Sequence, residues 1–204
     1  MKITVLAENL KRGLGIVLRG VTSKGTLPIL SGVMMKVSSD GLELLTTDLE
    51  ISFRVKIGVK VKEEGEIVVP AKLLFDLVSG LPVGPVDLVV EKQTLSISGG
   101  GVKTEIVGQA AEEFPSLPKS KGKVVKIGVD DFRKRIDRVA VSAARDDTQP
   151  VLSGILWSFS KDKVHLAATD RYRLGVDVLS GLKLDEKMSG KKLILPARAL
   201  QELS

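Results

Sequence analysis

Apolar and polar residues alternate over many short stretches of the chain, and two longer stretches carry a helical spacing instead. Residues 2–6 alternate in the manner of a strand with one buried face. The apolar side chains that follow recur at intervals of 4, 7, 8 and 11 residues, which places them on one face of a helix: Leu10, Leu14, Val17, Leu18 and Val21. The chain is therefore predicted to begin with a strand and a helix that packs through this face.

Seven further runs have the pattern of strands: residues 30–37, 42–46, 51–62, 66–69, 86–91, 94–98 and 103–107. Pro70 predicts the start of a short helix at 71–78, because proline suits the first turn of a helix. Residues 110–121 contain two prolines and are interpreted as a linker. This order predicts an α+β module in which helices cover one face of an antiparallel sheet.

The chain repeats itself at an offset of 122 residues. Residues 26–48 (TLPILSGVMMKVSSDGLELLTTD) align without a gap with residues 148–170 (TQPVLSGILWSFSKDKVHLAATD), and ten of the 23 positions are identical. After a shift of four residues, VVPAKLL at 68–74 aligns with ILPARAL at 194–200. The sequence therefore indicates a duplication, with one complete repeat at 1–122 and an incomplete one at 123–204.

The second repeat copies the elements of the first. Residues 124–128 are a weaker counterpart of the first strand. The helical face recurs with the same spacing: Phe132, Ile136, Val139, Ala140 and Ala143. The counterparts of the last three strands would lie beyond residue 204, so an unpaired strand edge is expected in this repeat.

Composition excludes several classes of protein. With 43% hydrophobic and 27% charged residues, the chain is neither disordered nor collagen-like. The absence of cysteine excludes disulfides, thiolate zinc sites and cysteine nucleophiles, and the single His165 argues against a multi-histidine metal site. No apolar run approaches the roughly 18 residues of a membrane span. We expect an intracellular protein without a cofactor.

Motifs of enzymes are weak in this sequence. Gly99-Gly100-Gly101 lacks the following lysine of a phosphate-binding loop, and a hairpin turn is the favoured interpretation. Asp146, Asp147 and Asp170 offer carboxylates for a cation or for an acid-catalysed hydrolase, although acidic residues at such places commonly form turns. His165 lies between two apolar residues and is expected on the wet face of a strand.

The two copies diverge after a shared Thr-Asp pair. Thr47-Asp48 and Thr169-Asp170 are expected to cap a turn, since both repeats have them. The second copy continues with Arg171-Tyr172-Arg173-Leu174 instead of an ordinary strand sequence. Both a function specific to this copy and a strand with two solvated arginines fit these residues.

Positive charge is concentrated in the second repeat. The net charge of +6 divides into +1 for residues 1–122 and +5 for residues 123–204. Basic residues also lie beside the apolar faces of both predicted helices. A helix with one buried and one cationic face contacts phosphates without reading sequence, but solubility alone produces the same pattern.

Together these segments resemble the bacterial DNA sliding clamps, the beta subunits of the replicative DNA polymerase III. The matching pieces extend over nearly the whole chain: MKITV, TLPILSGV, TTDLEISF, VVPAKLLFDLVSGLP, AEEFPSLP, DDTQPVLSGIL and ATDRYRLG. The resemblance implies a DNA-clamp fold in which each module is an antiparallel sheet with two helices on its inner face. It also implies a non-catalytic processivity factor, whose ring encircles double-stranded DNA and holds the polymerase there, in the cytoplasm at the nucleoid.

The resemblance, together with the basic helices, selects two sets of candidate site residues. DNA contacts are expected without sequence preference at Lys11, Arg12, Arg19, Lys24, Lys72, Arg133, Lys134, Arg138, Gln149 and Arg198. Of the family's other DNA-contact positions, Asp146, Pro150 and Val151 are poor phosphate ligands. A groove for peptide tails of the polymerase and clamp loader is implied at Leu152, Thr169, Arg171, Tyr172, Arg173 and Leu174.

The family ring consists of two subunits of three modules each, joined through the first and third modules. The present 204 residues contain no third module, so they are expected not to form the normal homodimer ring by themselves. Two other hypotheses remain open at this point. One is a peptide-binding interaction module of clamp fold that does not encircle DNA, and the other is the hydrolase on the three aspartates.

Overall fold

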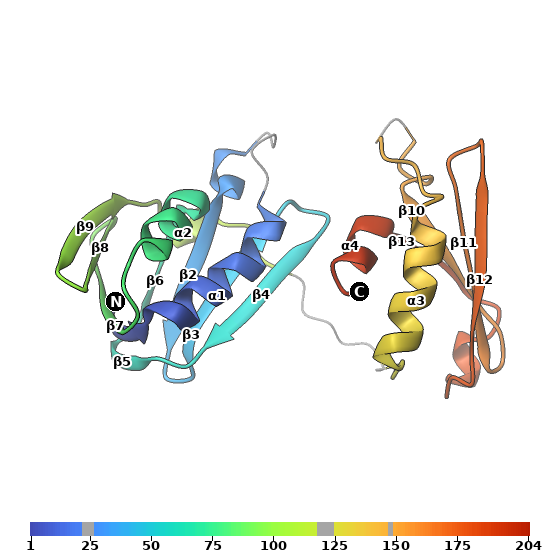
Figure 1. The fold of residues 1–204 in the computed structure, drawn as a ribbon, viewed down its shortest axis with the longest axis horizontal. Helices are drawn as coiled ribbons and strands as arrows, with labels where there is room; N and C mark the ends of the chain where they lie inside the picture. Colours follow the sequence, from blue (N-terminus) through green and yellow to red (C-terminus); the bar gives the residue numbers. More distant parts are fainter. Residues whose placement is uncertain (22–26, 118–124, 147–148) are drawn as a thin grey trace. The chain divides into compact units, whose positions relative to one another are not determined.

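The computed structural model describes residues 1–21, 27–117, 125–146 and 149–204. They divide into two compact units, unit 1 at Met1–Lys119 and unit 2 at Ser120–Ser204 (Figure 1). Each unit has an apolar core of its own. No helix in the described part of the chain is long and apolar enough to cross a membrane.

Unit 1 consists of two antiparallel sheets and two helices. One sheet has the strand order β5-β1-β7-β8-β9 and the other has the order β4-β3-β2-β6. The strands are β1 Lys2–Leu6, β2 Gly32–Ser38, β3 Gly41–Thr47, β4 Ser52–Ile57, β5 Lys60–Glu63, β6 Gly65–Pro70, β7 Pro85–Glu91, β8 Thr94–Gly99 and β9 Val102–Val107. The helices are α1 Ala7–Val17 and α2 Ala71–Ser79.

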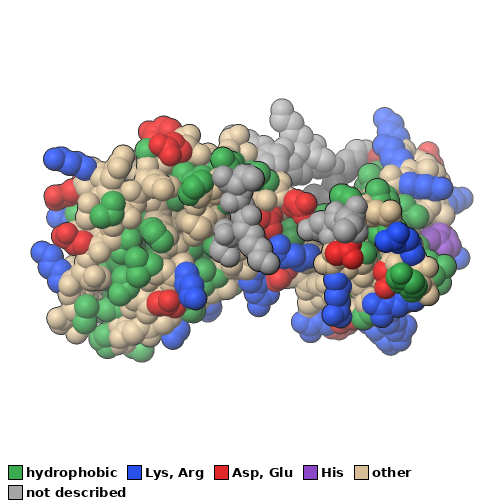
Figure 2. Space-filling view, turned by 90° about the horizontal axis from the view of Figure 1, so that it is seen from above, with side chains coloured by type: hydrophobic (Ala, Val, Ile, Leu, Met, Phe, Trp, Pro, Cys, Tyr) green, Lys and Arg blue, Asp and Glu red, His purple; other side chains and the backbone are tan. Residues whose placement is uncertain are grey.

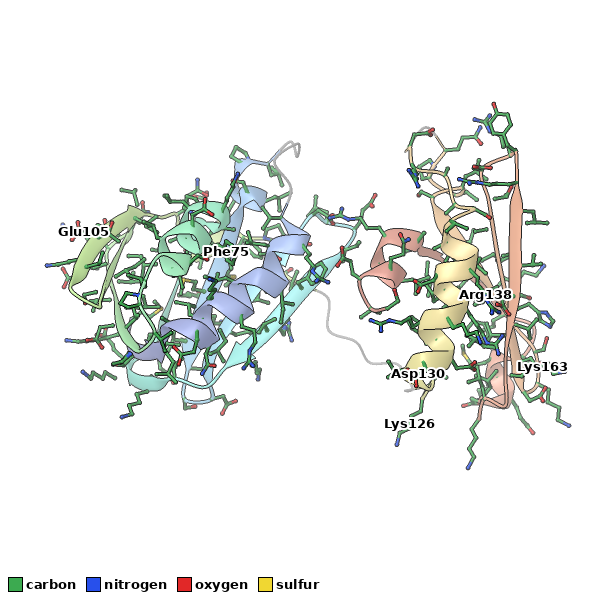
Figure 3. The ribbon with its side chains drawn as sticks, in the orientation of Figure 1. Phe75, Glu105, Lys126, Asp130, Arg138 and Lys163 are labelled. Carbon is green, nitrogen blue, oxygen red and sulfur yellow. The ribbon has the colours of Figure 1, made fainter. Side chains whose placement is uncertain are left out.

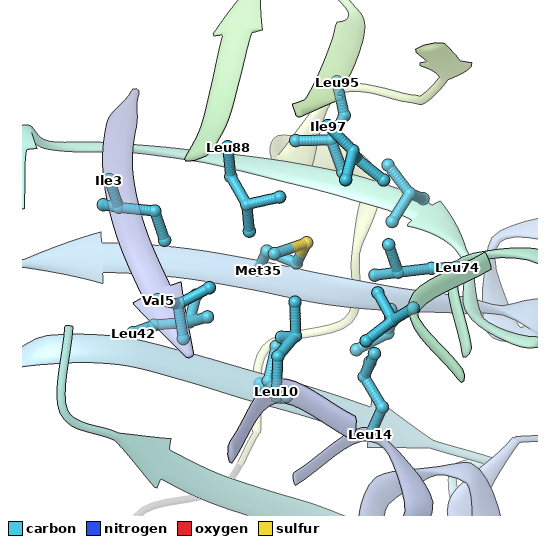
Figure 4. Close-up of a cluster of buried hydrophobic side chains, with 14 of the residues drawn as sticks. Ile3, Val5, Leu10, Leu14, Met35, Leu42, Leu74, Leu88, Leu95 and Ile97 are labelled. Atoms are coloured by element: carbon cyan, nitrogen blue, oxygen red, sulfur yellow. The ribbon is translucent and has the colours of Figure 1, made fainter. Parts of the chain in front are cut away.

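The core of unit 1 lies where the helices meet both sheets (Figure 4). Leu10 and Leu14 of α1 are fully buried, as their spacing predicts, and Leu74 of α2 joins them. Met35 and Leu88 bring one side chain from each sheet into the same cluster. Each such side chain contributes about 1.5–3 kcal/mol when it leaves water. The predicted helical face therefore fixes α1 on the sheets.

Unit 2 is a single four-stranded antiparallel sheet with the order β12-β11-β10-β13. Its strands are β10 Gly154–Phe159, β11 Lys163–Thr169, β12 Leu174–Ser180 and β13 Lys192–Pro196, and its helices are α3 Val129–Ala140 and α4 Ala197–Gln201. Ile136 and Val139 of α3 are fully buried against the sheet. Trp157 completes the core between Phe132 and Phe159, each 6.4 Å away between ring centroids.

The structure confirms the α+β module with helices on one face of an antiparallel sheet. It corrects the predicted strand at 51–62, which is two strands in different sheets: β4 pairs with β3, and β5 pairs with β1. The alternating pattern of residues 51–62 continues through this crossing, so the sequence gives no sign of it. The strand predicted at 30–37 begins at Gly32, because Pro28–Ser31 forms a 3-10 turn.

One other expectation was wrong. Residues 125–128 are not a strand, and residue 124 lies outside the described residues. Their counterpart β1 lies between β5 and β7, whereas no strand among the described residues of unit 2 pairs with 125–128. Within the predicted linker at 110–121, Ala111–Glu113 forms a 3-10 turn and Phe114 is only 8% exposed.

Candidate functional site: the outer groove of unit 2

An apolar groove of about 300 Å³ lies on the sheet of unit 2. We call it the outer groove. All four strands and the turn before β10 contribute to its lining: Val151, Leu152, Gly154, Leu156, Ala167, Ala168, Thr169, Leu174 and Ile194. An open apolar surface of this kind is typical of a site for a protein or peptide partner.

The register of the strands builds this groove. Ile194 of β13 pairs with Leu156 of β10, and Leu156 pairs with Ala167 of β11, so the three side chains form one row across the sheet. Their neighbours Ile155 and Trp157 point to the core that α3 and α4 cover. Because side chains alternate along a strand, the row Ile194–Leu156–Ala167 faces away from both helices.

Unit 1 has the same row in the same register. Val68 pairs with Met34, and Met34 pairs with Leu45. The repeat alignment relates five apolar positions of unit 1 to five lining residues of the outer groove: Ile29 to Val151, Leu30 to Leu152, Met34 to Leu156, Leu45 to Ala167 and Val68 to Ile194. Both units thus present an equivalent apolar surface on this side of the sheet.

In unit 1 this surface is covered by the chain itself. Phe114 and Leu117, from the stretch after β9, join the five residues in one apolar cluster. The hydrogen bonds between Val68 and Gln109, at 3.1 and 2.8 Å, hold the start of this stretch beside β6. The outer groove of unit 2 is therefore the equivalent of a surface that an aromatic and an aliphatic side chain fill in unit 1.

The Thr-Asp pairs form matching turns, as their occurrence in both repeats predicts. In unit 2 the Thr169 hydroxyl donates to the Arg173 carbonyl at 2.7 Å and accepts from the Arg171 N–H at 3.1 Å. In unit 1 the Thr47 hydroxyl bonds the Ile51 carbonyl and the Leu49 N–H in the same way, both at 3.0 Å. Leu49 and Arg171 both adopt positive φ, 77° and 79°.

Asp170 secures the turn at the rim of the outer groove. Its carboxylate accepts the N–H groups of Tyr172 and Arg173 at 3.1 and 3.0 Å, and the Arg173 Nε at 2.9 Å. Partial burial raises the pKa of Asp170, but these backbone and side-chain donors outweigh it and hold the pKa below the usual value. The carboxylate is therefore bound within its own turn, where it positions Leu174 at the start of β12.

The implied groove residues fall into two groups. Leu152, Thr169 and Leu174 line the outer groove together. Arg171, Tyr172 and Arg173 do not line it but form the Thr-Asp turn beside it, where the side chain of Tyr172 is 94% exposed. Leu156 and Ile194 were not selected from the sequence. The sequence holds no local signal for them, because the residues on both sides of each one are apolar as well.

The candidate DNA residues lie mostly on helices. Lys11 and Arg12 are exposed on α1, Lys72 on α2, and Arg133, Lys134 and Arg138 on α3. Arg19 follows α1 in a 3-10 turn, Arg198 is exposed on α4, and Gln149 is exposed before β10. Lys24 lies outside the described residues. Figure 2 shows numerous Lys and Arg side chains over unit 2.

An ion-pair network reduces the charge that α3 presents. Arg135 contacts Asp131 at 3.0 Å and Asp177 of β12 at 2.7 Å, and Arg138, labelled in Figure 3, lies 3.5 Å from Asp177. Hydrogen bonds to Asp131 and Asp177 raise the pKa of Arg135. Burial raises the pKa of Asp177, but the Val178 N–H and the Arg135 guanidinium outweigh this and lower it. The network ties α3 to the sheet.

We expect Asp177→Asn to destabilise unit 2 by about 1–2 kcal/mol at pH 7, the size of a hydrogen bond to a charged group. Because the pKa of folded Asp177 lies below the ordinary 3.8, its contribution is complete above that value and is lost as the pH falls through the lowered pKa. Urea unfolding followed by Trp157 fluorescence should show the variant and wild type converging between about pH 5 and pH 2. Asp162→Asn is the matched control, and an equal loss there would contradict the network's role.

The residues considered as possible enzyme motifs lie in turns and strands of the fold. Gly99 ends β8, and Gly100 and Gly101 form the hairpin turn to β9 rather than the start of a helix. His165 is exposed on β11 between buried Val164 and Leu166, as predicted. Within the described ranges no group of three or more His, Cys, Asp or Glu side chains has the arrangement of a metal site. Asp147, one of the three aspartates of the hydrolase hypothesis, lies outside those ranges.

Two modules of antiparallel sheet with helices on one face, repeated along one chain, define the class of DNA-clamp proteins. Residues 1–118 match the model of the DNA polymerase III beta subunit, N-terminal domain, and residues 126–204 match that of its central domain. The chain belongs to the DNA polymerase III beta subunit family. This is a family of non-catalytic processivity subunits.

Named relatives agree with this assignment. The beta sliding clamp homolog GriR of Streptomyces muensis is 33% identical over 204 residues, and the beta sliding clamp of Bacillus subtilis is 29% identical over 215 residues. The crystal structure of the Bacillus subtilis clamp matches all of the chain with a TM-score of 0.92 at 27% identity. That of the Pseudomonas aeruginosa beta subunit, at 30% identity, has a TM-score of 0.89. The chain spans about half the length of these proteins, 54–56%.

Proposed function

We propose that the chain provides the N-terminal and central domains of a DNA sliding clamp, at residues 1–122 and 123–204, which tethers DNA polymerase to duplex DNA. The observation that carries this proposal is the outer groove, whose equivalent in unit 1 is filled by Phe114 and Leu117. A partner peptide with large apolar side chains would bury the exposed row in the same way. Peptide tails of the polymerase and of clamp-loader subunits are the proposed occupants.

The exposed basic side chains of α1, α2, α3 and α4 are the proposed DNA contacts. They sit on the helical side of each sheet and offer lysine and arginine charges without an arrangement for reading bases. Binding through phosphates alone leaves a protein free to move along the duplex. Processivity then follows from encirclement in a ring with a second copy rather than from tight binding. Acting on chromosomal DNA places the protein at the nucleoid, in the cytoplasm.

A second candidate is a peptide-binding module that works without a ring. The observation in its favour is that all residues lining the outer groove belong to unit 2. Capture of a peptide by this groove requires neither DNA nor a second copy. The two candidates differ in whether DNA binding accompanies peptide binding.

The test combines light scattering with retention on DNA, using the 204 residues as they stand. Ring closure in the family uses a third module, so we expect a monomer that binds DNA but is not retained on closed circular DNA in high salt. A stable dimer retained on circular DNA, and released when the DNA is linearised, would contradict this expectation. DNA affinity should fall steeply with salt, and a salt-independent affinity would contradict the proposed contacts.

A further inference from the structure

Besides its basic helices, unit 2 has a charged surface. It lies at the end of the sheet opposite the outer groove. The groove occupies the end formed by Gly154, Thr169, Leu174 and Pro196. At the other end the strands finish or begin at Phe159, Lys163, Ser180 and Lys192. Figure 3 shows Lys163 at the same end of the unit as Lys126 and Asp130, where α3 begins.

Two segments come together at this end. The Leu182 N–H donates to the Asp162 carbonyl at 3.1 Å, which joins the turn after β10 to the chain after β12. Farther along, the Phe159 N–H donates to the Lys191 carbonyl at 2.9 Å and the Gly190 N–H returns a bond to the Phe159 carbonyl at 2.9 Å. Residues 160–163 and 182–192 therefore form one continuous surface.

Six exposed lysines project from these two segments: Lys161, Lys163, Lys183, Lys187, Lys191 and Lys192. We call this set the lysine edge. Three acidic residues accompany them, Asp162, Asp185 and Glu186, whereas α3 has four basic and three acidic residues. The largest surplus of positive charge in unit 2 is thus here rather than on α3.

The repeat shows that this charge is not part of the shared module. Unit 1 has the following residues at the positions of Lys161, Lys163, Lys191 and Lys192: Ser39, Gly41, Gly65 and Glu66. The offset between the repeats also rises from 122 to 126 between Asp170 and Ile194, so unit 2 has four additional residues in this region. A feature confined to one copy of a duplicated fold points to a role that the fold itself does not require.

We propose that the lysine edge binds the phosphate backbone of duplex DNA, as a contact separate from the helical faces. The basic residues of this surface are all lysines. Lysine binds phosphate as a point charge on a flexible stem, without the planar bidentate geometry that arginine uses for carboxylate and phosphate alike. Exposed aromatic or large apolar anchors, which a protein interface requires, are absent from the described residues 160–163 and 182–192. Contacts of this kind are independent of base sequence.

The experiment measures the affinity of the 204-residue chain for a fluorescein-labelled 24-base-pair duplex by anisotropy, from 25 to 200 mM NaCl. The test variant is Lys161→Gln/Lys163→Gln/Lys187→Gln/Lys191→Gln. The matched control removes four exposed lysines of unit 1: Lys56→Gln/Lys60→Gln/Lys92→Gln/Lys103→Gln. A third variant, Arg133→Gln/Lys134→Gln, tests the helical face.

Each lost phosphate contact lowers the slope of log affinity against log salt by about 0.9, so we expect the test variant to lose about 3–4 in slope. Its affinity at 50 mM NaCl should fall at least tenfold, while the control stays within about twofold. Wild-type affinity and slope in the test variant, or an equal loss in the control, would overturn the proposal. Displacement of the duplex by polyglutamate at an equal concentration of charge would also overturn it, in favour of an acidic protein partner.

The variants separate this inference from the proposed function. A loss in the test variant with no loss in Arg133→Gln/Lys134→Gln supports the lysine edge and contradicts the helical contacts. The reverse result overturns the lysine edge and leaves the helical contacts in place. Thermal unfolding of each variant should match the wild type, because every substituted side chain is exposed. If the fourfold variant unfolds at a lower temperature than the wild type, single substitutions at Lys187 and Lys191 allow the same comparison of DNA affinity.

Discussion

Leu174→Asp should abolish binding of a polymerase tail peptide, with a loss in affinity of at least 100-fold. Leu174 lines the outer groove, and its side chain is 67% exposed in the unbound chain. A carboxylate there would be buried without a partner when an apolar peptide covers it, which costs several kcal/mol. Since the side chain is solvated beforehand, the stability of unit 2 should not change. Isothermal titration of the peptide into wild type and variant measures the difference.

Val176→Asp is the matched control for this experiment. Val176 lies two residues farther along β12 on the same side of the sheet, is also 67% exposed, and is not among the residues that line the groove. It should retain peptide affinity within about threefold. Ile194→Asp, on β13 across the groove, should reproduce the loss. Wild-type affinity in Leu174→Asp, or an equal loss in Val176→Asp, would contradict the assignment of the groove.

Phe114→Ala should destabilise unit 1 by about 3 kcal/mol, the lower end of the range for removing a buried phenylalanine. Phe114 is 8% exposed and packs on the row Val68–Met34–Leu45. Its removal leaves the equivalent of the outer groove open in unit 1 and takes away the apolar contact that holds residues 111–117 there. Thermal unfolding by far-ultraviolet circular dichroism should show an early transition.

The single tryptophan separates the two units in this measurement. Trp157 belongs to the core of unit 2, so its fluorescence transition should stay at the wild-type temperature while the circular dichroism transition moves. Val83→Ala is the control, because Val83 is 83% exposed and its truncation should leave both transitions in place. An unchanged circular dichroism transition in Phe114→Ala would show that residues 111–117 do not stabilise unit 1.

Most of the fold follows from local patterns in the sequence. The spacing of Leu10, Leu14 and Val17 predicts the buried face of α1, because helix packing depends on side chains that recur within one element. The duplication predicts that the Thr-Asp turns match, and they do, including the left-handed conformation of Leu49 and Arg171. The buried face of α1 and the conformation of each Thr-Asp turn are both set by residues close together in the chain.

The elements that sequence reasoning missed depend on contacts between distant residues. The division of residues 51–62 into β4 and β5 arises because two different sheets offer partners for one alternating stretch. Phe114 looks like part of a linker because Pro115 and Pro118 follow it, and only the row of apolar side chains from three strands explains its burial. Pairing between strands and burial across elements are not encoded in the local pattern.

The candidate site also contains residues that the sequence selects and residues that only the structure reveals. Leu152, Thr169 and Leu174 were selected through the resemblance, and the structure brings them to one groove. Leu156 and Ile194 escaped selection because a single apolar residue in a strand gives no sign of which face it occupies. The register of β10 with β13 supplies that information.

The central claim is that one chain holds a polymerase peptide and duplex DNA at the same time. Energy transfer between a labelled tail peptide and a labelled duplex, recorded as the chain is added, tests this claim most directly. We expect transfer to appear with wild type, to be absent with Leu174→Asp, and to disappear in 1 M NaCl. Displacement of one ligand by the other, or separate binding of both without transfer, would contradict the account.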